Sequence, residues 1–215
     1  MKRFFISLII ILCAFSCTKN SDIDNLPNKK AENFYALTVG NSWVYKNFKY
    51  NSATELYEDA GIIDSVSIVG TEIISNETYY KFRRFTAGND NNENFCNPNG
   101  EHFEFFREID GDLVNSDGEI KFTNINYEER LFFDAGWGIV YETLEVDETI
   151  KNVEAGAFNC INSKRYAKIY GTGEILPGID RFYYSKGIGL IYDTSSFTSI
   201  ATPIFIRQLS SYNVQ

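Results

Sequence analysis

The chain has a single histidine, His102, on which most acid–base or metal chemistry would depend. A serine–histidine–acid triad needs this residue as its base, and a histidine-rich zinc site needs it as a ligand. Cys96 lies a few positions before it and could act as a nucleophile, but closeness in sequence does not build a catalytic pair. We therefore assign no catalytic residue, no metal site and no cofactor from the sequence.

Carboxylates are plentiful, with 29 Asp and Glu in total, so composition permits a glycosidase-type acid pair. No spacing positions such a pair, and the acidic residues alternate along expected strands as solvent-facing groups do. The run Asn89-Asp90-Asn91-Asn92-Glu93 offers oxygen ligands suited to calcium. It lacks the spacing of an EF-hand loop, which favours an ordinary polar loop.

The four cysteines divide into two pairs with different prospects. Cys13 and Cys17 lie at the N-terminal end, while Cys96 and Cys160 lie in the body of the chain. In an exported, oxidising setting Cys96 and Cys160 could form a disulfide, worth about 4 kcal/mol for a loop of roughly 65 residues. The alternative is two unpaired cysteines, because sequence cannot show that their Cβ atoms meet.

The N-terminus is typical of a secretory signal peptide. Lys2 and Arg3 supply positive charge, an apolar run follows, and small residues precede Cys17. The apolar run is too short to span a bilayer, which takes about 20 residues. We expect a signal peptide over residues 1–16.

The cleavage zone Ala14-Phe15-Ser16-Cys17 resembles the bacterial lipobox, in which the cysteine after the cut carries lipid. The resemblance implies two or three acyl chains on Cys17, and more than one chain gives stable membrane attachment. Residues 17–33 are polar and predict a flexible tether. Thr18, rather than Asp, after the cysteine favours the outer membrane by analogy with enterobacterial sorting, on either its periplasmic or its surface face.

The charge balance argues against nucleic acid as a partner. The net charge of the whole chain is −9, and removal of Lys2 and Arg3 makes it more negative. This field repels phosphate backbones and anionic lipid heads. The 18 Phe, 14 Tyr and 2 Trp, against one Met and 4 Pro, indicate a β-rich fold.

Apolar and polar residues alternate through almost all of the chain after residue 34. Asp110-Gly111 and Asp117-Gly118 predict tight hairpin turns. The expected strands are Ser42–Tyr50, Ile63–Ile74, Thr78–Thr86, His102–Ile109, Asp112–Asn115, Glu119–Asn124, Glu128–Asp134, Val140–Val153, Ala157–Tyr170, Arg181–Ser185, Gly189–Asp193 and Ile204–Tyr212. Gly171–Gly178 is expected to be a loop.

The predicted fold class is all-β. About ten to twelve antiparallel strands in regular succession predict a meander that forms a barrel, a curved half-barrel or a sandwich. No domain boundary or repeat is visible, so residues 34–215 are expected to form one domain.

Three short phrases, at residues 35–45, 153–160 and 184–192, resemble those of a broad group of uncharacterised Bacteroidetes cell-envelope lipoproteins. Residues 35–45 (YALTVGNSWVY) look like that group's opening strand, with Ala36 where proline is common. Residues 153–160 (VEAGAFNC) and 184–192 (YSKGIGLIY) resemble a later hairpin and a later strand entry. The resemblance implies an envelope lipoprotein and carries no biochemical activity.

Trp43, Tyr45 and Trp137 are the candidate binding residues, since aromatic side chains can line ligand sites. Trp43 and Tyr45 fall on one face of their strand, most simply toward the core. The expectation is a non-enzymatic lipoprotein, membrane-bound through Cys17, that binds an apolar or glycan ligand or an envelope protein. A structural module of an envelope complex, or a carboxylate-dependent hydrolase, remains an alternative.

Overall fold

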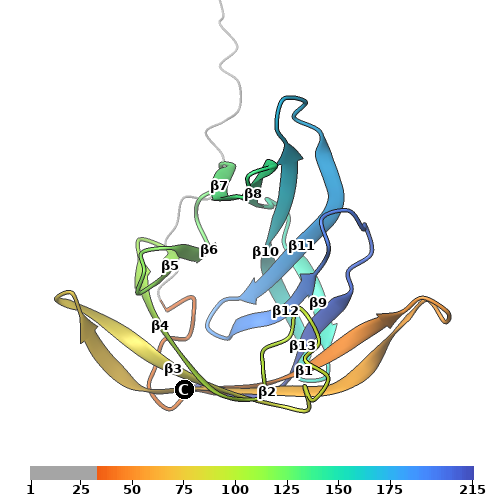
Figure 1. Ribbon diagram of the computed structural model, residues 1–215. Coiled ribbons are helices and arrows are strands. Elements are labelled where there is room, and N and C mark those ends of the chain that lie inside the picture. Colours follow the sequence, from red (N-terminus) through yellow and green to blue (C-terminus); the bar gives the residue numbers. More distant parts are fainter. Residues whose placement is uncertain (1–32) are drawn as a thin grey trace, which may run out of the picture.

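The computed structural model describes residues 33–215 of the chain. The predicted signal peptide, the lipid acceptor Cys17 and nearly all of the predicted tether lie outside the described residues. All regular structure in the described part is β-strand, which confirms the all-β prediction, and there are 13 strands (Figure 1). Residues 33–215 contain no helix of the length and apolarity that a membrane crossing requires.

The strands are β1 (Ser42–Asn51), β2 (Leu56–Ile74), β3 (Glu77–Ala87), β4 (Gly100–Ile109), β5 (Asp112–Asn115), β6 (Ile120–Thr123), β7 (Arg130–Asp134), β8 (Gly138–Leu144), β9 (Thr149–Val153), β10 (Gly156–Ile169), β11 (Ile175–Ser185), β12 (Gly189–Ser195) and β13 (Phe205–Asn213).

The strands form one antiparallel sheet in the order β6-β5-β4-β3-β2-β1-β13-β12-β11-β10-β8-β7, with β9 paired to β10 beside this path. The last strand, β13, lies between β1 and β12, so both ends of the described chain meet in the middle of the sheet. Figure 1 shows the sheet bent into a deep curve, with β4 to β6 rising on one side and β10 and β11 on the other. The fold is therefore the curved, open form among the predicted alternatives.

The two end strands of the sheet, β6 and β7, follow one another in the chain. No ladder joins them among the described strands, but Arg130 of β7 donates to the carbonyl of Ile120 on β6 at 3.0 Å. A side-chain contact thus brings together two edges that backbone pairing leaves open.

Alternation along each strand decides which side chains enter the curve. On β1, Trp43, Tyr45 and Asn47 are buried. The alternation along the strand predicted this inward position for Trp43 and Tyr45. On β2, Val66 is buried while Val69 is exposed on the other face. We call the face that carries Trp43, Tyr45 and Val66 the inner face.

Several predicted boundaries are wrong. β2 starts at Leu56 rather than at Ile63, because it pairs along the whole of β1, as far as Asn51. The strand expected over Val140–Val153 is two strands, because β8 ends at Leu144 and β9 starts at Thr149, after residues 145–148 (EVDE). Both strands pair with β10, β8 along residues 163–169 and β9 along residues 156–160, so the ladder on this side of β10 is interrupted and then resumes. β9 also contacts β12 and β13. The loop expected over Gly171–Gly178 is shorter, because β11 starts at Ile175, which pairs with Lys168.

Residues 34–37 close one end of the curve. Phe34, Tyr35, Ala36 and Leu37 are all buried before β1 begins. The Tyr35 ring lies edge-on to Phe122 of β6, with ring centroids 6.2 Å apart. Residues 34–37 therefore add side chains to the hydrophobic core on the concave side of the sheet, although they belong to no strand.

Candidate ligand-binding pocket

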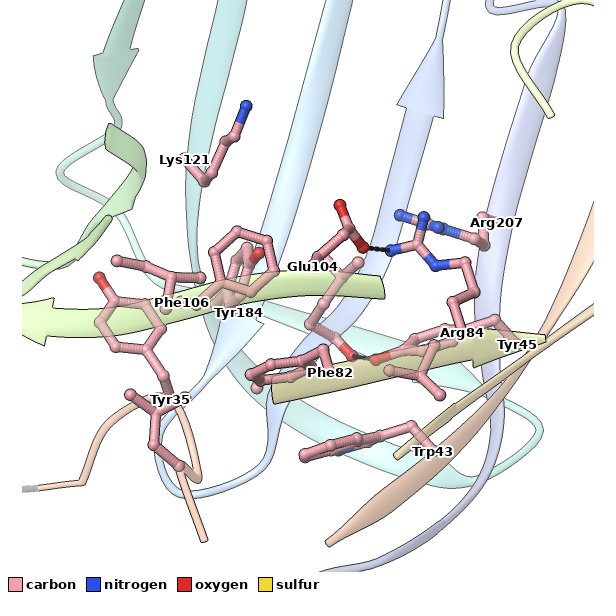
Figure 2. A pocket seen from close by; sticks show the side chains of 15 residues that line it. Tyr35, Trp43, Tyr45, Phe82, Arg84, Glu104, Phe106, Lys121, Tyr184 and Arg207 are labelled. Carbon is pink, nitrogen blue, oxygen red and sulfur yellow. Dashed lines mark hydrogen bonds and ion pairs between the residues drawn. The ribbon is translucent and has the colours of Figure 1, made fainter. Parts of the chain in front are cut away.

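The inner face holds a hollow of about 120 Å³ beside residues 35–37, open on one side (Figure 2). Strands distant in sequence contribute to it, because the curve of the sheet turns their inner faces toward one another. Its lining is Tyr35, Leu37, Trp43, Tyr45, Val66, Phe82, Arg84, Glu104, Phe106, Leu113, Lys121, Tyr184, Gly189, Leu190 and Arg207.

Aromatic rings dominate the lower part of the pocket, and backbone carbonyls fix several of them. The Trp43 indole donates from Nε1 to the carbonyl of Ile188 at 2.7 Å, and the Tyr45 hydroxyl donates to the carbonyl of Leu190 at 3.0 Å. Trp43 also stacks on Phe82, with ring centroids 6.1 Å apart and planes 12° from parallel. The polar atoms of Trp43 and Tyr45 are thus satisfied by the protein, so these side chains contribute apolar ring surface to the wall of the hollow.

A charged group lies above these rings. Arg84 pairs with Glu104 at 2.8 Å. Arg207 donates to both oxygens of Asp193, at 3.1 Å from Nε and 2.5 Å from Nη2. Its Nη1 also lies 3.7 Å from Asp64.

A second, polar hollow of about 190 Å³ adjoins the first and shares Arg84 and Arg207 with it. Phe95 and Phe205 also line it, together with Asn97, Asp193 and Ser195. Phe95 is 43% exposed and packs edge-on against Phe197 of the β12–β13 loop, with centroids 4.8 Å apart. The two arginines therefore mark the boundary between an aromatic compartment and a polar one.

Asp64 is the most deeply buried carboxylate of this group, at 1% exposed. Burial by itself would raise its pKa, but Arg207 and hydrogen bonds from Thr86 and Asn47 more than offset it, so the pKa lies below the ordinary value. Thr86 donates to it at 2.5 Å. Asp64 is thus an anion at neutral pH that holds Arg207 in place, which does not suit a general acid.

The structure brings two of the three candidate binding residues together. Trp43 and Tyr45 both line the pocket. Trp137 lies in the turn between β7 and β8, 46% exposed, and its carbonyl accepts a hydrogen bond from the amide of Tyr170. It lines neither the aromatic hollow nor the other hollows described for the domain, so it does not join the other two.

The possible disulfide between Cys96 and Cys160 is absent, because both are free thiols. The two sulfur atoms have different neighbours. Cys96 is in the loop between β3 and β4, and its Sγ lies 4.0 Å from Oδ1 of Asn47 on β1. Cys160 is on β10, and its Sγ lies 3.6 Å from the carbonyl oxygen of Phe158. Burial raises the pKa of each thiol to about 11, so neither is an activated nucleophile.

His102 and the loop after β3 carry ordinary structural contacts. His102 Nε2 lies 2.8 Å from the carbonyl of Pro98. Asn89 accepts from the amide of Glu93 at 2.7 Å and donates to the carbonyl of Asn97 at 2.9 Å, which uses its oxygen and nitrogen within the loop. Across residues 33–215, no three His, Cys, Asp or Glu side chains cluster as ligands for a metal ion.

Arg84, Glu104 and Arg207 were not among the residues singled out from the sequence. One signal could have found the first of them, because Arg84 stands between Phe82 and Thr86 on the inward side of an alternating strand. A charged residue at an inward position needs a partner or a ligand. The pairing of Glu104 opposite Phe82, which places that partner, depends on the register between β3 and β4.

Comparisons with known proteins give information on the fold and not on a ligand or an activity. No protein family matches the chain, and neither does any curated protein sequence. A presumed lipoprotein from Parabacteroides distasonis has a similar structure, with a TM-score of 0.50 and 13% identity over 86% of this chain and 100% of that one. A presumed exported protein from Bacteroides fragilis, described as having a YmcC-like fold, aligns at 0.49 with 12% identity over 84% of this chain and 98% of its own. At this identity the likeness to the Parabacteroides protein establishes a shared fold and assigns no ligand or activity.

Proposed function

We propose that this chain is a lipid-anchored lipoprotein of the outer membrane whose β domain binds an apolar ligand without transforming it. The observation that supports binding is the half-open hollow lined by the rings of Tyr35, Trp43, Phe82, Phe106 and Tyr184. Concave, mainly apolar surface with a few placed polar groups is the usual form of a small-molecule site.

The volume of the hollow limits what it can hold. A dry cavity of about 150 Å³ in another protein binds benzene. The hollow here, at about 120 Å³, accommodates one ring or the end of a short hydrocarbon chain. A polar end of such a ligand would face the adjoining polar hollow of about 190 Å³.

Non-enzymatic binding is supported by the state of the nearby carboxylates. Asp64 and Asp193 both hold Arg207, and Glu104 holds Arg84. A carboxylate-dependent hydrolase would need one acid kept protonated beside the substrate. Asp180, whose pKa burial raises to about 6, does not line either hollow.

The anchor is supported by the leader and the lipobox-like residues before Cys17. Its test is metabolic labelling of the expressed chain with radioactive palmitate, followed by membrane fractionation. The native chain should carry label and sediment with outer membranes, whereas Cys17→Ala should lose the label. Label on both chains would contradict the assignment of Cys17.

Ligand binding can be tested through Trp43, which faces the hollow. Trp137→Phe removes the other tryptophan, so fluorescence then reports on Trp43 alone. Titration of that variant with octanol should change its emission saturably. The titration uses the chain from residue 17 with Cys17→Ser, which carries no lipid. A lipidated chain would need detergent, and detergent micelles would compete with the protein for octanol.

A matched pair of substitutions on β2 separates the pocket from the rest of the surface. Val66→Phe places a ring in the hollow and should abolish the titration, whereas Val69→Phe on the opposite face should leave it unchanged. Equal titration of both variants would show that octanol binds elsewhere. Thermal unfolding of each variant confirms that the domain is intact.

A further inference from the structure

Resting on the proposed pocket, we propose that the ligand is an amphiphile with an oxyanion head, that Arg84 receives this head, and that Glu104 competes with the ligand for the same guanidinium. The apolar body would lie among the rings below. The head would stop where the aromatic compartment meets the polar one.

The position of the head follows from the two arginines. Arg84 and Arg207 each line both hollows, and Figure 2 shows their guanidinium groups side by side above the rings. Lys121 lines the same hollow from β6. The carboxylates at this level are already paired with the two arginines. Among the described residues here, the unused hydrogen-bonding capacity belongs to a donor, Nε of Arg84, which suits an oxyanion head.

Arg207 is already committed to the protein. Asp193 takes two of its nitrogens in a forked pair, and Asp64 approaches a third. These acids are buried, with side chains 10% and 1% exposed. Removal of Arg207 from them would leave buried charges without a partner, so its donors are not available for exchange.

Arg84 is committed far less. Its one described ion pair is with Glu104, through a single nitrogen at 2.8 Å. Its Nε is buried and donates to no atom among the described residues. A guanidinium presents five donors in a planar fork, so Arg84 retains capacity for a second, two-oxygen partner.

Glu104 is the one carboxylate of the group that can leave easily. Its side chain is 39% exposed, against 1% for Asp64. Water solvates the carboxylate of Glu104 when it separates, and the incoming oxyanion replaces its charge beside Arg84, whose side chain is 19% exposed. An oxyanion held in place by its own apolar body can therefore displace Glu104 toward solvent.

Carboxylates and phosphate monoesters share the chemistry that Arg84 recognises, since both present two oxygens to the fork. Matched probes with the same eight-carbon body separate the possibilities: octanoate, octyl phosphate and octanol. Each is titrated into the chain from residue 17 that carries Cys17→Ser and Trp137→Phe, with Trp43 emission as the readout.

Octanoate or octyl phosphate should bind more tightly than octanol, and the tighter of the two identifies the head. Arg84→Gln should weaken that oxyanion by about tenfold or more and leave octanol unchanged, since a hydrogen bond to a charged group is worth at least that factor. Glu104→Gln should strengthen the oxyanion severalfold, because the competitor loses its charge. The Glu104→Gln variant keeps Arg84, so it tests the proposal even if the Arg84→Gln variant does not fold.

The same two strands provide matched controls. Arg83 and Glu101 form an ion pair on the outer face, one residue from Arg84 and on the strand of Glu104. Arg83→Gln and Glu101→Gln should change no affinity. Octanol binding as tightly as both oxyanions, or Glu104→Gln having no effect, would overturn the oxyanion head and leave the pocket standing. Failure of all three probes would instead overturn the pocket itself.

Discussion

The hydroxyl of Tyr35 donates to the carbonyl of Gly111 at 2.6 Å, across 76 positions of sequence. Tyr35 precedes the first strand, and Gly111 is the turn between β4 and β5, at φ +90°. This bond therefore ties the segment that closes one end of the curve to the far side of the sheet. The Tyr35 ring also lines the pocket, so the same contact sets one of its walls.

Tyr35→Phe should lower the free energy of unfolding by about 1 kcal/mol, the net value of one such hydrogen bond. A larger loss is not expected, because the Gly111 carbonyl also accepts from the amide of Asn124 at 3.0 Å. Urea denaturation measures the change. Tyr212→Phe, at a tyrosine that is 41% exposed, serves as the control and should be neutral. Equal effects of the two substitutions would contradict the role given to this bond.

An ion cluster around a buried glutamate links β7, β8 and β10 at one end of the sheet. Glu142 of β8 is 1% exposed and accepts from Arg130 at 2.9 Å and from Arg165 at 2.6 Å. The Arg165 guanidinium also lies 3.5 Å from the centroid of Phe132. The group joins β7, β8 and β10 through charge as well as through the ladder.

Glu142→Gln should destabilise the domain by about 3–5 kcal/mol, because it removes a buried charge that two partly buried arginines share. Glu77→Gln is the control, since Glu77 pairs with Arg107 but is 53% exposed, and its loss should be under about 1 kcal/mol. Midpoints of chemical denaturation at neutral pH compare the two. A loss for Glu142→Gln no greater than the control would show that the cluster does not contribute to stability.

The sequence was sufficient for the parts of the fold that depend on local pattern. Alternation predicted that Trp43 and Tyr45 point inward, and both are buried. It could not predict the break between β8 and β9, because apolar residues recur on both sides of residues 145–148. The break interrupts a ladder that both strands make with β10, and the point of interruption depends on tertiary contacts that a local pattern does not record.

The candidate site was predictable only in part for a related reason. The partnership of Arg84 with Glu104 depends on a register across the long loop that joins β3 to β4. Arg207 meets Asp64 and Asp193 only because β13 inserts between β1 and β12. No spacing in a single sequence encodes contacts over such separations.

Asp180 makes stability depend on pH. Burial raises its pKa from 3.8 to about 6, against the opposing effect of hydrogen bonds from Ser196 and of Arg165. The folded state therefore holds this proton more tightly than the unfolded state. Its contribution is fully favourable below pH 3.8, is lost as the pH rises through about 6, and leaves a buried carboxylate above that.

Asp180→Asn should therefore stabilise the domain at pH 8 by roughly 2 kcal/mol and by clearly less at pH 5. Denaturation curves of the native and variant chains at both pH values give the difference. Asp117→Asn, at an exposed turn, should show no such pH dependence. A gain that is the same at pH 5 and pH 8 would mean that Asp180 titrates at its ordinary value.

The two cysteines of the domain should behave as separate thiols. In the Cys17→Ser chain, alkylation after unfolding without reductant should add two labels, one each at Cys96 and Cys160. In the folded protein at pH 8 both should react slowly, because burial raises each pKa to about 11 and little thiolate forms. Cys96, which is half-buried, should react before Cys160, which is fully buried.

A reductant should not change the unfolding temperature of this chain, since no cross-link constrains its unfolded state. Recovery of an unlabelled protein that gains two labels only after reduction would instead establish a disulfide, and it would require the sheet to bring together two sulfur atoms that here have different neighbours.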